Sequence, residues 1–322
     1  MLRARARYIL IRLLECFVTL IFLSFVIFSL LYLAPGDPAK SLVGVRNVTP
    51  ELLDKIRAQY HLNDPFLSQY VRWIKGALSL DFGNSIKAGY SVVEYVSSHA
   101  AVTFELAGIT LLSSAIIGIW LGIVSAHNKG KLIDKIIEVS SLVGTSMPGF
   151  AIGLVLLYIF SYWLGIFPMY GLGDENNPLD VLRHLTLPAL TLTIGNTAML
   201  VKITRSAMLK EVSSDYSVFM KARALGKKKI VLSQLKNASP PILTSTGLFL
   251  AGLFGGAVLV ENVFSIPGIG QLLTSSVTFR DVPVVQFVAL MLAALICLTS
   301  ALIDIVVYLL NPKSHGAPGE RI

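Results

Sequence analysis

The sequence has few charged residues and almost no cysteine. Charged side chains make up 14% of its 322 residues, well below the roughly 25% that is typical of soluble domains. Both cysteines, Cys16 and Cys297, lie in apolar runs, so they indicate neither a disulfide nor a metal site. No segment alternates between apolar and polar residues at period two, which argues against a β-barrel. The length would suit about two soluble domains, but the mean hydropathy of +0.70 indicates a membrane protein instead.

The sequence also lacks the elements of three kinds of catalytic site. A P-loop needs G-x-x-x-x-G-K-[ST], and the Gly-Lys pairs at Lys131 and Lys227 lack both the earlier glycine and the Ser or Thr. The five histidines are scattered without metal-ligand spacing. An intramembrane serine protease needs a Ser–His pair, and Ser146 and His184 are expected toward opposite membrane faces. We therefore expect no catalytic residue, no metal ligand and no cofactor in this chain.

Six long runs without a formal charge recur along the chain, and a helix needs roughly 20 apolar residues to span the hydrocarbon core. They predict an all-α polytopic membrane protein with six transmembrane helices. The first run follows several arginines, as in a signal peptide, but it is too long and lacks a cleavage site, so we expect it to be retained. The runs are Cys16–Ala34, Leu106–Ala126, Val139–Gly173, Leu185–Val201, Asn237–Val260 and Val282–Ile303.

The positions of lysine and arginine predict that both termini face the cytoplasm (N-in/C-in). Most of the 27 cations fall before the first run, in the second loop, in the loop between the fourth and fifth runs, and in the tail. The net charge of +8 then reflects topology rather than a nucleic-acid partner. The predicted segments are a cytoplasmic N-terminus with the first helix (1–34), an external amphipathic segment (35–100), a five-helix transmembrane core (101–311) and a cytoplasmic tail (312–322).

Local signals predict details inside these segments. Thr49 and Pro50 begin a helix as cap and first turn. An amphipathic stretch, Phe66–Leu80, carries aromatic residues that suit either a cap packed on the bundle or a helix lying in lipid. Pro148 predicts a kink in the third span. Pro240 and Pro241 are expected in the first turn of the fifth span.

The few acids near the spans, Glu105, Glu261 and Asp304, all lie close to the expected interfaces. An acid within the bilayer is a functional candidate by default, but structural hydrogen bonding is the favoured interpretation at these positions. The glycines of the fifth span favour close helix packing over a role in the substrate path.

The largest cytoplasmic loop carries the segment KARALGKKK, Lys221–Lys229. Asp215 follows two serines that suit a helix N-cap, so Tyr216–Leu225 is predicted to be a short helix with Gly226 as its left-handed terminator. Lys227–Lys229 would then lie at the C-terminal end, where the helix dipole favours cations. Three interpretations of this segment stay open. It rests on anionic lipid, it docks on another protein, or it is a generic positive-inside loop without a specific partner.

The motif at Lys221–Gly226, with Asp215–Tyr216 before it and Asn237–Pro241 after it, resembles the EAA loop of ABC-importer permeases. Seven other segments resemble the dipeptide/oligopeptide/nickel subfamily in the same order and spacing. They are Leu33–Pro38, Asp81–Ser85, His184–Leu190, Thr204–Leu209, Glu261–Phe264, Pro267–Leu272 and Arg280–Gln286. The resemblance extends over nearly the whole chain.

The resemblance implies a permease subunit of a type I ABC importer in the bacterial inner membrane. It implies a homologous second permease, with a heterodimer favoured, two cytoplasmic ATPases that hold ATP and Mg, and an external binding protein. The substrates would be di-/oligopeptides or nickel/metal chelates. An ion-coupled secondary transporter, or a membrane scaffold that does not transport, is the alternative; the uncharged middle of every span disfavours ion coupling.

The resemblance also assigns roles to particular residues. The cytoplasmic loop 211–238 would couple to the ATPases, with the contact over 215–238. Lys227–Lys229, directly after the EAA glycine, depart from the family pattern, and we take this departure as a hypothesis that the partner ATPase has an acidic groove. The predicted coupling residues are Asp215, Tyr216, Ala222, Arg223, Ala224, Gly226 and Asn237. Candidates for the substrate pathway are Ser146, Asn196, Thr197 and Glu261, and those for binding-protein docking are Asp37, Asp81 and Arg280.

Overall fold

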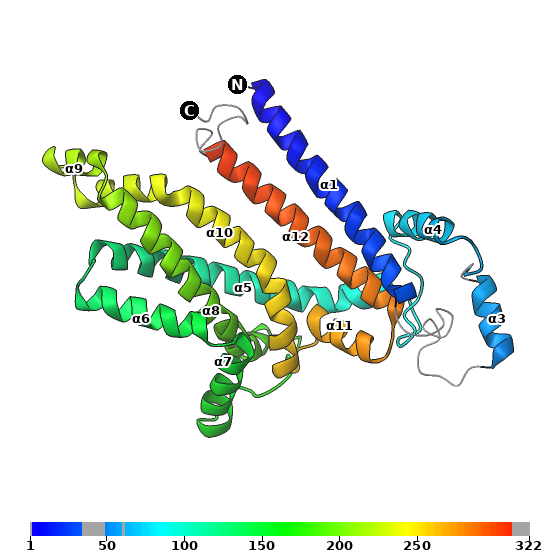
Figure 1. The fold of residues 1–322 in the computed structure, drawn as a ribbon. Coiled ribbons are helices and arrows are strands. Elements are labelled where there is room, and N and C mark those ends of the chain that lie inside the picture. The colour runs from blue at the N-terminus through cyan, green and yellow to red at the C-terminus, as the bar shows by residue number, and fades with distance from the viewer. Residues whose placement is uncertain (1, 34–48, 60–61, 311–322) are drawn as a thin grey trace. The chain divides into compact units, whose positions relative to one another are not determined.

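The computed structural model describes residues 2–33, 49–59 and 62–310, and these are almost entirely helical (Figure 1). Within these ranges the only β-type pairing is one isolated bridge between Asn84 and Ser91. The all-α prediction is therefore confirmed. The helices are α1 (Leu2–Leu33), α3 (Pro50–Gln59), α4 (Phe66–Leu78), α5 (Val92–His127), α6 (Leu132–Ser146), α7 (Gly149–Leu156), the π-helix η1 (Leu157–Trp163), α8 (Pro178–Val212), α9 (Asp215–Ala222), α10 (Lys227–Val263), α11 (Ile269–Thr278) and α12 (Val282–Leu310).

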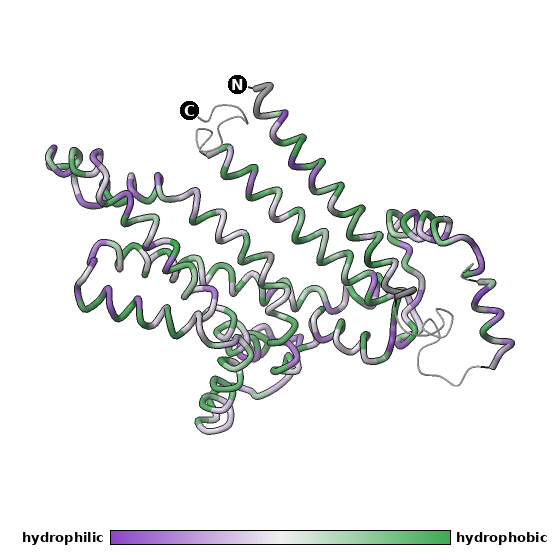
Figure 2. Tube along the Cα trace, in the orientation of Figure 1, coloured by the Kyte–Doolittle hydropathy of each residue, from purple (hydrophilic) through white to green (hydrophobic). Residues whose placement is uncertain are grey.

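The predicted membrane spans correspond to four long helices and two bent pairs. Helices α1, α5, α8 and α12 are each long and apolar enough to cross a bilayer. The pair α6 and α7–η1 passes the same test as a broken span, as does α10 with a bend near its middle. Helices α1 and α12 are hydrophobic over most of their length, whereas α3 and the start of α10 are hydrophilic (Figure 2).

Proline has different effects at its two predicted sites. At Pro148 the helix does not merely kink: α6 ends, Pro148 takes an extended backbone, and α7 starts at an angle of 103° to α6. Pro240 and Pro241 were expected in the first turn of the fifth span, and this prediction was wrong. Helix α10 begins at Lys227, so both prolines lie inside it, and its bend of 41° falls near residue 251 instead.

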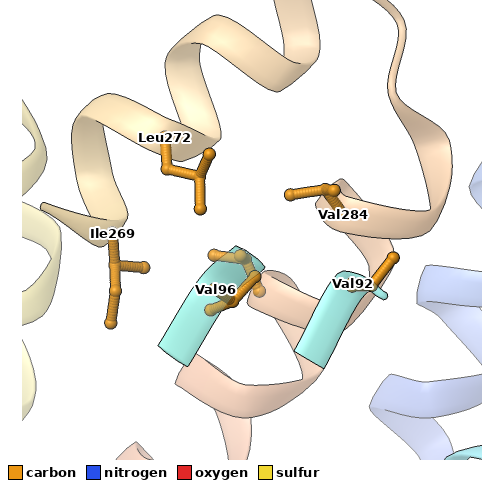
Figure 3. Packing of buried hydrophobic residues seen from close by; sticks show 6 residues of the cluster. Val92, Val96, Ile269, Leu272 and Val284 are labelled. Carbon is orange, nitrogen blue, oxygen red and sulfur yellow. The ribbon is translucent and has the colours of Figure 1, made fainter. Parts of the chain in front are cut away.

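By packing, the chain divides into two units, the first being residues 1–104 with 265–298 and the second 105–264 with 299–322. The core of the first unit joins the start of α5 to α11 and the start of α12. Figure 3 shows this cluster, in which Val92 and Val96 of α5 lie beside Ile269 and Leu272 of α11 and Val284 of α12. This packing brings the chain that precedes α5 close to the turn that precedes α12.

Within the first unit, the aromatic face of α4 packs on α1. The Tyr70 hydroxyl lies 2.8 Å from the Ser24 hydroxyl, and the Tyr70 and Trp73 rings lie 5.6 Å from the Phe28 ring. Trp73 also contacts Phe82 edge to face. Helix α4 therefore packs on α1 through its aromatic side chains, and its placement as a cap or in lipid stays a prediction.

The second unit is organised around α8, which packs against α6, α7 and α10. Small residues permit the closest approaches. A Cβ atom added at Gly122 of α5 would lie 2.5 Å from Thr204 Cβ, and one added at Gly144 of α6 would lie 2.8 Å from Ala198 Cβ. In lipid, where apolar surface gains little by burial, such close contacts are a main source of helix association.

Four residues other than glycine adopt positive φ in the described structure, and each follows the C-terminal end of a helix. They are Leu80 after α4, Ala224 after α9, Ser265 after α10 and Arg280 after α11. At three of them the paired hydrogen bonds of a Schellman motif are present, for example Ala224 N–H to Lys221 O and Leu225 N–H to Met220 O. The motif normally selects glycine, so these ends carry backbone strain.

The α5–α8 contact leads to a stability prediction. Replacing Gly122 by Val forces side-chain atoms into Thr204, and overpacking of this kind costs about 1–3 kcal/mol. The G122V protein should therefore melt several degrees below the parent in detergent, as measured by intrinsic fluorescence. Gly108→Val on the same helix is the matched control, because nothing lies within 4 Å of a Cβ added there. Equal melting temperatures for both variants would contradict the packing argument.

Candidate functional site

The predicted coupling loop forms a short helix, α9, between two long helices. Its N-cap is Ser214, whose backbone is extended (φ −73°, ψ 152°) as expected for a cap. The Ser214 hydroxyl does not cap α9; it donates to the Glu211 carbonyl at 2.6 Å. Asp215 occupies the first turn, where its negative charge is favourable. The predicted start of the helix is therefore correct to within one residue.

The predicted end of α9 was wrong. The helix stops at Ala222 rather than Leu225, and Ala224 rather than Gly226 adopts the left-handed conformation, with φ 54°. Gly226 is instead the N-cap of α10, with φ −59° and ψ 141°. The chain therefore leaves α9 and starts α10 within a few residues.

This correction reverses the electrostatic environment of Lys227–Lys229. They form the first turn of α10 instead of the last turn of α9. At a helix N-terminus the dipole opposes positive charge, by about 0.3–1 kcal/mol for each exposed cation. The three lysines are therefore placed where the local backbone disfavours them.

Buried polar side chains anchor α9 to its neighbours. Ser217 of α9 and Gln234 of α10 are both fully buried, and the Gln234 amide donates to the Ser217 hydroxyl. Gln234 Oε1 lies 3.0 Å from His127 Nε2 at the end of α5. The Gln234 amide thus has a hydrogen-bond partner at both its nitrogen and its oxygen, as buried polar groups normally do. This chain of contacts, which we call the α9 anchor (His127, Ser217, Gln234), fixes α9 against α5 and α10.

A second set of contacts holds the start of α9. The Tyr216 hydroxyl donates to Glu211 Oε2 at 2.8 Å, and the Asn237 side chain hydrogen-bonds to Tyr216. Burial, and after it the bond to Glu211, raises the pKa of the Tyr216 phenol. Tyr216 therefore remains a neutral donor across the physiological range. Two of the predicted coupling residues, Tyr216 and Asn237, are thus brought together.

The opposite side of α9 is exposed and carries both apolar and charged side chains. Val218 and Phe219 are 58% and 60% exposed, and the Arg223 guanidinium lies 5.6 Å from the Phe219 ring centroid. Ala222 and Ala224 are also exposed. Small side chains next to an exposed aromatic ring permit close contact with another protein surface. Helix α9 therefore has an exposed surface on one side and buried hydrogen bonds to α5 and α10 on the other.

A buried ion pair lies in the same unit, between the α5–α6 turn and α8. The Arg205 guanidinium binds Asp134 with two hydrogen bonds of 2.8 and 2.9 Å, and Asp134 is 2% exposed. The carboxylate also accepts from the Ser125 hydroxyl at 2.5 Å and from the Gly130 N–H at 2.8 Å. These four donors compensate the buried charge. They also fasten the α5–α6 turn to α8 less than two helical turns before α8 ends.

The four predicted pathway residues come from three helices of the second unit. Ser146 is exposed at the end of α6, and its hydroxyl donates to Leu142 O at 2.8 Å. Asn196 and Thr197 are half-buried near the middle of α8. Glu261 is fully buried near the end of α10. Their role in a pathway remains a prediction.

Of the three predicted docking residues, Asp37 lies outside the described residues, and Asp81 and Arg280 are both exposed. The segments that carry them meet. Asp281, next to Arg280, is fully buried and accepts from the Ser85 hydroxyl at 2.5 Å and from the Lys87 N–H at 3.1 Å. The contact joins segment 81–91 to the turn before α12, so Asp81 and Arg280 project from joined loops.

Sequence reasoning missed the residues that hold the site together. His127, Ser217, Gln234 and Asp134 were not assigned roles, and Arg205 was noted only as part of a motif. A signal was present for two of them: Asp134 is an acid among basic residues, and Arg205 follows a long uncharged run. A buried charge in either position needs a partner. Nothing in the sequence pairs Ser217 with Gln234.

Comparison with known families agrees with the order of motifs. Residues 118–316 match the model of the family described as "Binding-protein-dependent transport system inner membrane component". Residues 5–96 match its N-terminal companion, "Binding-prot-dependent transport system membrane comp, N-term". Together the two matches cover most of the chain, including α9 and both of its flanking helices.

Three named relatives are similar to this chain over nearly their full length. The probable peptide ABC transporter permease protein y4tP of Sinorhizobium fredii is 34% identical, over 95% of this chain and 98% of the relative. The dipeptide transport system permease protein DppB of Alkalihalophilus pseudofirmus is 31% identical with the same coverage. The glutathione transport system permease protein GsiC of Salmonella paratyphi A is 32% identical, over 95% and 97%.

Among solved structures, a chain of the MetNI methionine ABC transporter in an inward-facing conformation has a similar fold. The TM-score is 0.54 at 16% sequence identity, over 68% of this chain and 97% of that chain. At this identity the likeness concerns the fold alone, and it agrees with the predicted type I importer fold.

The α9 anchor yields a prediction about local stability. Gln234→Leu removes both side-chain hydrogen bonds and leaves the Ser217 hydroxyl buried without a donor, which costs about 1–3 kcal/mol. Amide hydrogens of α9 should then exchange at least about tenfold faster, since 1.4 kcal/mol corresponds to a factor of ten. Hydrogen exchange with mass spectrometry measures this. Ser239→Ala on the same helix, which loses only a bond to Lys236 O, should leave α9 unchanged.

The buried ion pair yields a second prediction, with its control supplied by the same arginine. Asp134→Asn leaves the Arg205 charge without its buried partner and should destabilise the protein by about 3–5 kcal/mol. Glu138 also lies near Arg205, at 3.7 Å, but its side chain is 58% exposed. Exposed pairs contribute at most about 1 kcal/mol, so E138Q should melt close to the parent. An equal fall in the melting temperature of both variants would contradict the argument that the buried Asp134 contact stabilises the protein more than the exposed Glu138 contact does.

Proposed function

Since this chain belongs to the family of binding-protein-dependent transport system inner membrane components, we propose that it forms half of the translocation pathway of an ATP-driven importer. It is a multi-pass permease of the bacterial inner membrane. The proposed partners are a homologous second permease, two cytoplasmic ATPases and an external binding protein. ATP and Mg would be bound by the ATPases, because this sequence contains no P-loop.

The proposed cargo is a short peptide. Three relatives at 31–34% identity are named for peptide, dipeptide or glutathione transport, and glutathione is itself a tripeptide derivative. Nickel or metal chelates are the second candidate, because the motif order resembles a subfamily that also takes them. Cargo choice would rest mainly with the external binding protein.

The observation that carries the proposal is the construction of α9. It presents an exposed surface of Val218, Phe219 and Ala222, while its buried side is fixed by the α9 anchor. It also connects directly to the ends of α8 and α10, two long helices that pack along one another. A displacement of α9 would therefore move both α8 and α10. ATP-driven switching of a helix bundle between two states requires such a joint movement of several helices.

In this mechanism the chain itself performs no chemistry. The ATPases would bind α9 through its exposed surface and move when they bind and hydrolyse ATP. The α9 anchor and the Asp134–Arg205 pair would keep α9, α10, α8 and the α5–α6 turn moving together. The binding protein would deliver cargo on the other face, near the joined loops that carry Asp81 and Arg280.

A substitution in the exposed surface tests the coupling. Ala222→Glu places a bulky charge in the proposed contact, where an unpaired buried charge is costly. Peptide-stimulated ATP hydrolysis and uptake by the reconstituted complex should fall at least about tenfold, the equivalent of 1.4 kcal/mol. Ala101→Glu is the control, because Ala101 is an exposed helical alanine one turn from the exposed Glu105.

The same reconstitution separates the alternatives. Uptake that needs ATP and the binding protein, but no ion gradient, supports the importer. Uptake driven by an ion gradient without ATP would indicate a secondary transporter. Assembly without any transport, in the presence of all partners, would indicate a scaffold.

A further inference from the structure

Helix α8 carries two cations one turn apart, Lys202 and Arg205, and the chain neutralises only the second. Arg205 is bound by the buried Asp134 carboxylate, and the Glu138 carboxylate lies 3.7 Å from it. Across the described residues, no Asp or Glu side chain lies within 4.0 Å of the Lys202 ammonium group. That group donates instead to the Thr145 hydroxyl of α6, at 2.7 Å. Lys202 is thus a cation in a spanning helix that is held by a neutral group.

The Lys202 side chain points away from the end of α8 that connects to α9. Gly144 of α6 packs on Ala198 of α8, since a Cβ atom added at Gly144 would lie 2.8 Å from the Ala198 Cβ. Thr145 follows Gly144, so it lies close to the level of Ala198, about one turn before Lys202. The ammonium group therefore reaches back along α8, beside the uncharged run Leu185–Val201. A lysine that snorkelled to the lipid headgroups near α9 would extend the other way.

Lys202 borders an open and uncharged face of α8. Gly195, Met199 and Lys202 share this face, because they are four and three residues apart. Met199 is 44% exposed, and nothing lies within 4 Å of a Cβ atom added at Gly195. On α6, Thr145 and the neighbouring Ser146 are exposed as well. A ligand that lies along this face of α8 would therefore meet a positioned ammonium group.

A carboxylate is the group that this cation lacks. A charge within a spanning segment is costly without a charged partner, and it marks a candidate functional site. Lysine has three N–H donors, and Thr145 accepts from one of them, so two remain for a carboxylate. Short peptides supply that group, because each has a C-terminal carboxylate whatever its side chains are. Away from bulk water such a contact is stronger than at an exposed surface.

We propose that Lys202 binds the C-terminal carboxylate of the peptide cargo as it passes along α8, and that Thr145 positions the ammonium group. The proposal deepens the proposed function and rests on it, because it requires a peptide to cross beside α8. It adds a cation to the predicted pathway residues. Ser146 follows Thr145, and Asn196 lies less than two turns before Lys202 on α8. A single contact of this kind serves peptides of any sequence.

Charge variants in the reconstituted complex test the proposal. The vesicles contain the full-length chain with its proposed partners and saturating binding protein, and the probe is radiolabelled dialanine. Lys202→Gln should lower the maximal rate of uptake at least about tenfold, because hydrogen bonds to charged groups are among the strongest. Lys202→Arg keeps the charge and should retain most of the rate. Lys135→Gln removes an exposed lysine from α6, and this matched control should leave uptake unchanged.

The Thr145 hydroxyl separates recognition of cargo from a structural role. Thr145→Val removes the acceptor that holds the ammonium group but keeps the charge, so uptake should fall less than in K202Q. Both variants should melt close to the parent in detergent. An equal loss of uptake in K202Q and K202R, together with a lowered melting temperature, would indicate a purely structural lysine and overturn the proposal.

A carbodiimide crosslink identifies the group that Lys202 contacts. Dicyclohexylcarbodiimide enters lipid and condenses a carboxylate with an adjacent amine to an amide, while the reagent takes up the released water and becomes a urea. Added during ATP-driven uptake, it should join dialanine to the fragment that contains Lys202, as measured by mass spectrometry. Dialanine amide, which has no carboxylate, should give no adduct. A link from Lys202 to an Asp or Glu of the second permease instead would overturn the proposal.

The uptake assay also separates failure of this proposal from failure of the proposed function. If the parental complex takes up neither dialanine nor glutathione, the proposed cargo is wrong and this inference fails with it. Parental uptake that K202Q leaves unchanged overturns only the role of Lys202.

Discussion

Close approach between helices is the constraint on which this structure depends, because apolar side chains gain little by exchanging lipid for protein. Helix α8 achieves it with Gly122 of α5 against Thr204 and Gly144 of α6 against Ala198. These contacts need no polar group within the spans. Ser113 of α5 and Thr193 of α8 add one hydrogen bond of 2.8 Å within the apolar runs. At one end of the unit, the α9 anchor and the Asp134–Arg205 pair join α5, α6, α8, α9 and α10. Packing thus makes the helices a unit, and polar contacts attach α9 to it.

Hydropathy was sufficient to predict the class of fold and the long apolar helices, because a bilayer imposes a minimum apolar length on every crossing helix. It could not predict helix ends. Charged residues at the starts of α5 and α10 and at the end of α8 carry no hydrophobic signal, yet these helices continue for several turns beyond the apolar runs. The two prolines in α10 show the same limit. Local sequence suggested a first turn, whereas Lys227–Lys236 extend the helix and place Pro240 and Pro241 inside it.

The short helix α9 was predicted from the sequence, but the contacts that hold it were not. Its start could be predicted because the capping residues are neighbours in sequence. The anchor beneath it joins residues that are far apart, such as His127 and Gln234, and no local pattern encodes such a pair. The error at Gly226 has a similar cause. Glycine favours positive φ on average, but here the Schellman hydrogen bonds impose that conformation on Ala224 two residues earlier.

The conformation of Ala224 has a consequence for how this segment can vary over evolution. An exposed alanine normally accepts most substitutions, since its side chain contacts little. With φ at 54°, position 224 instead admits glycine and asparagine readily, whereas β-branched residues clash with their own backbone. The alanine of the motif is thus restricted by its own backbone, even though its side chain is exposed.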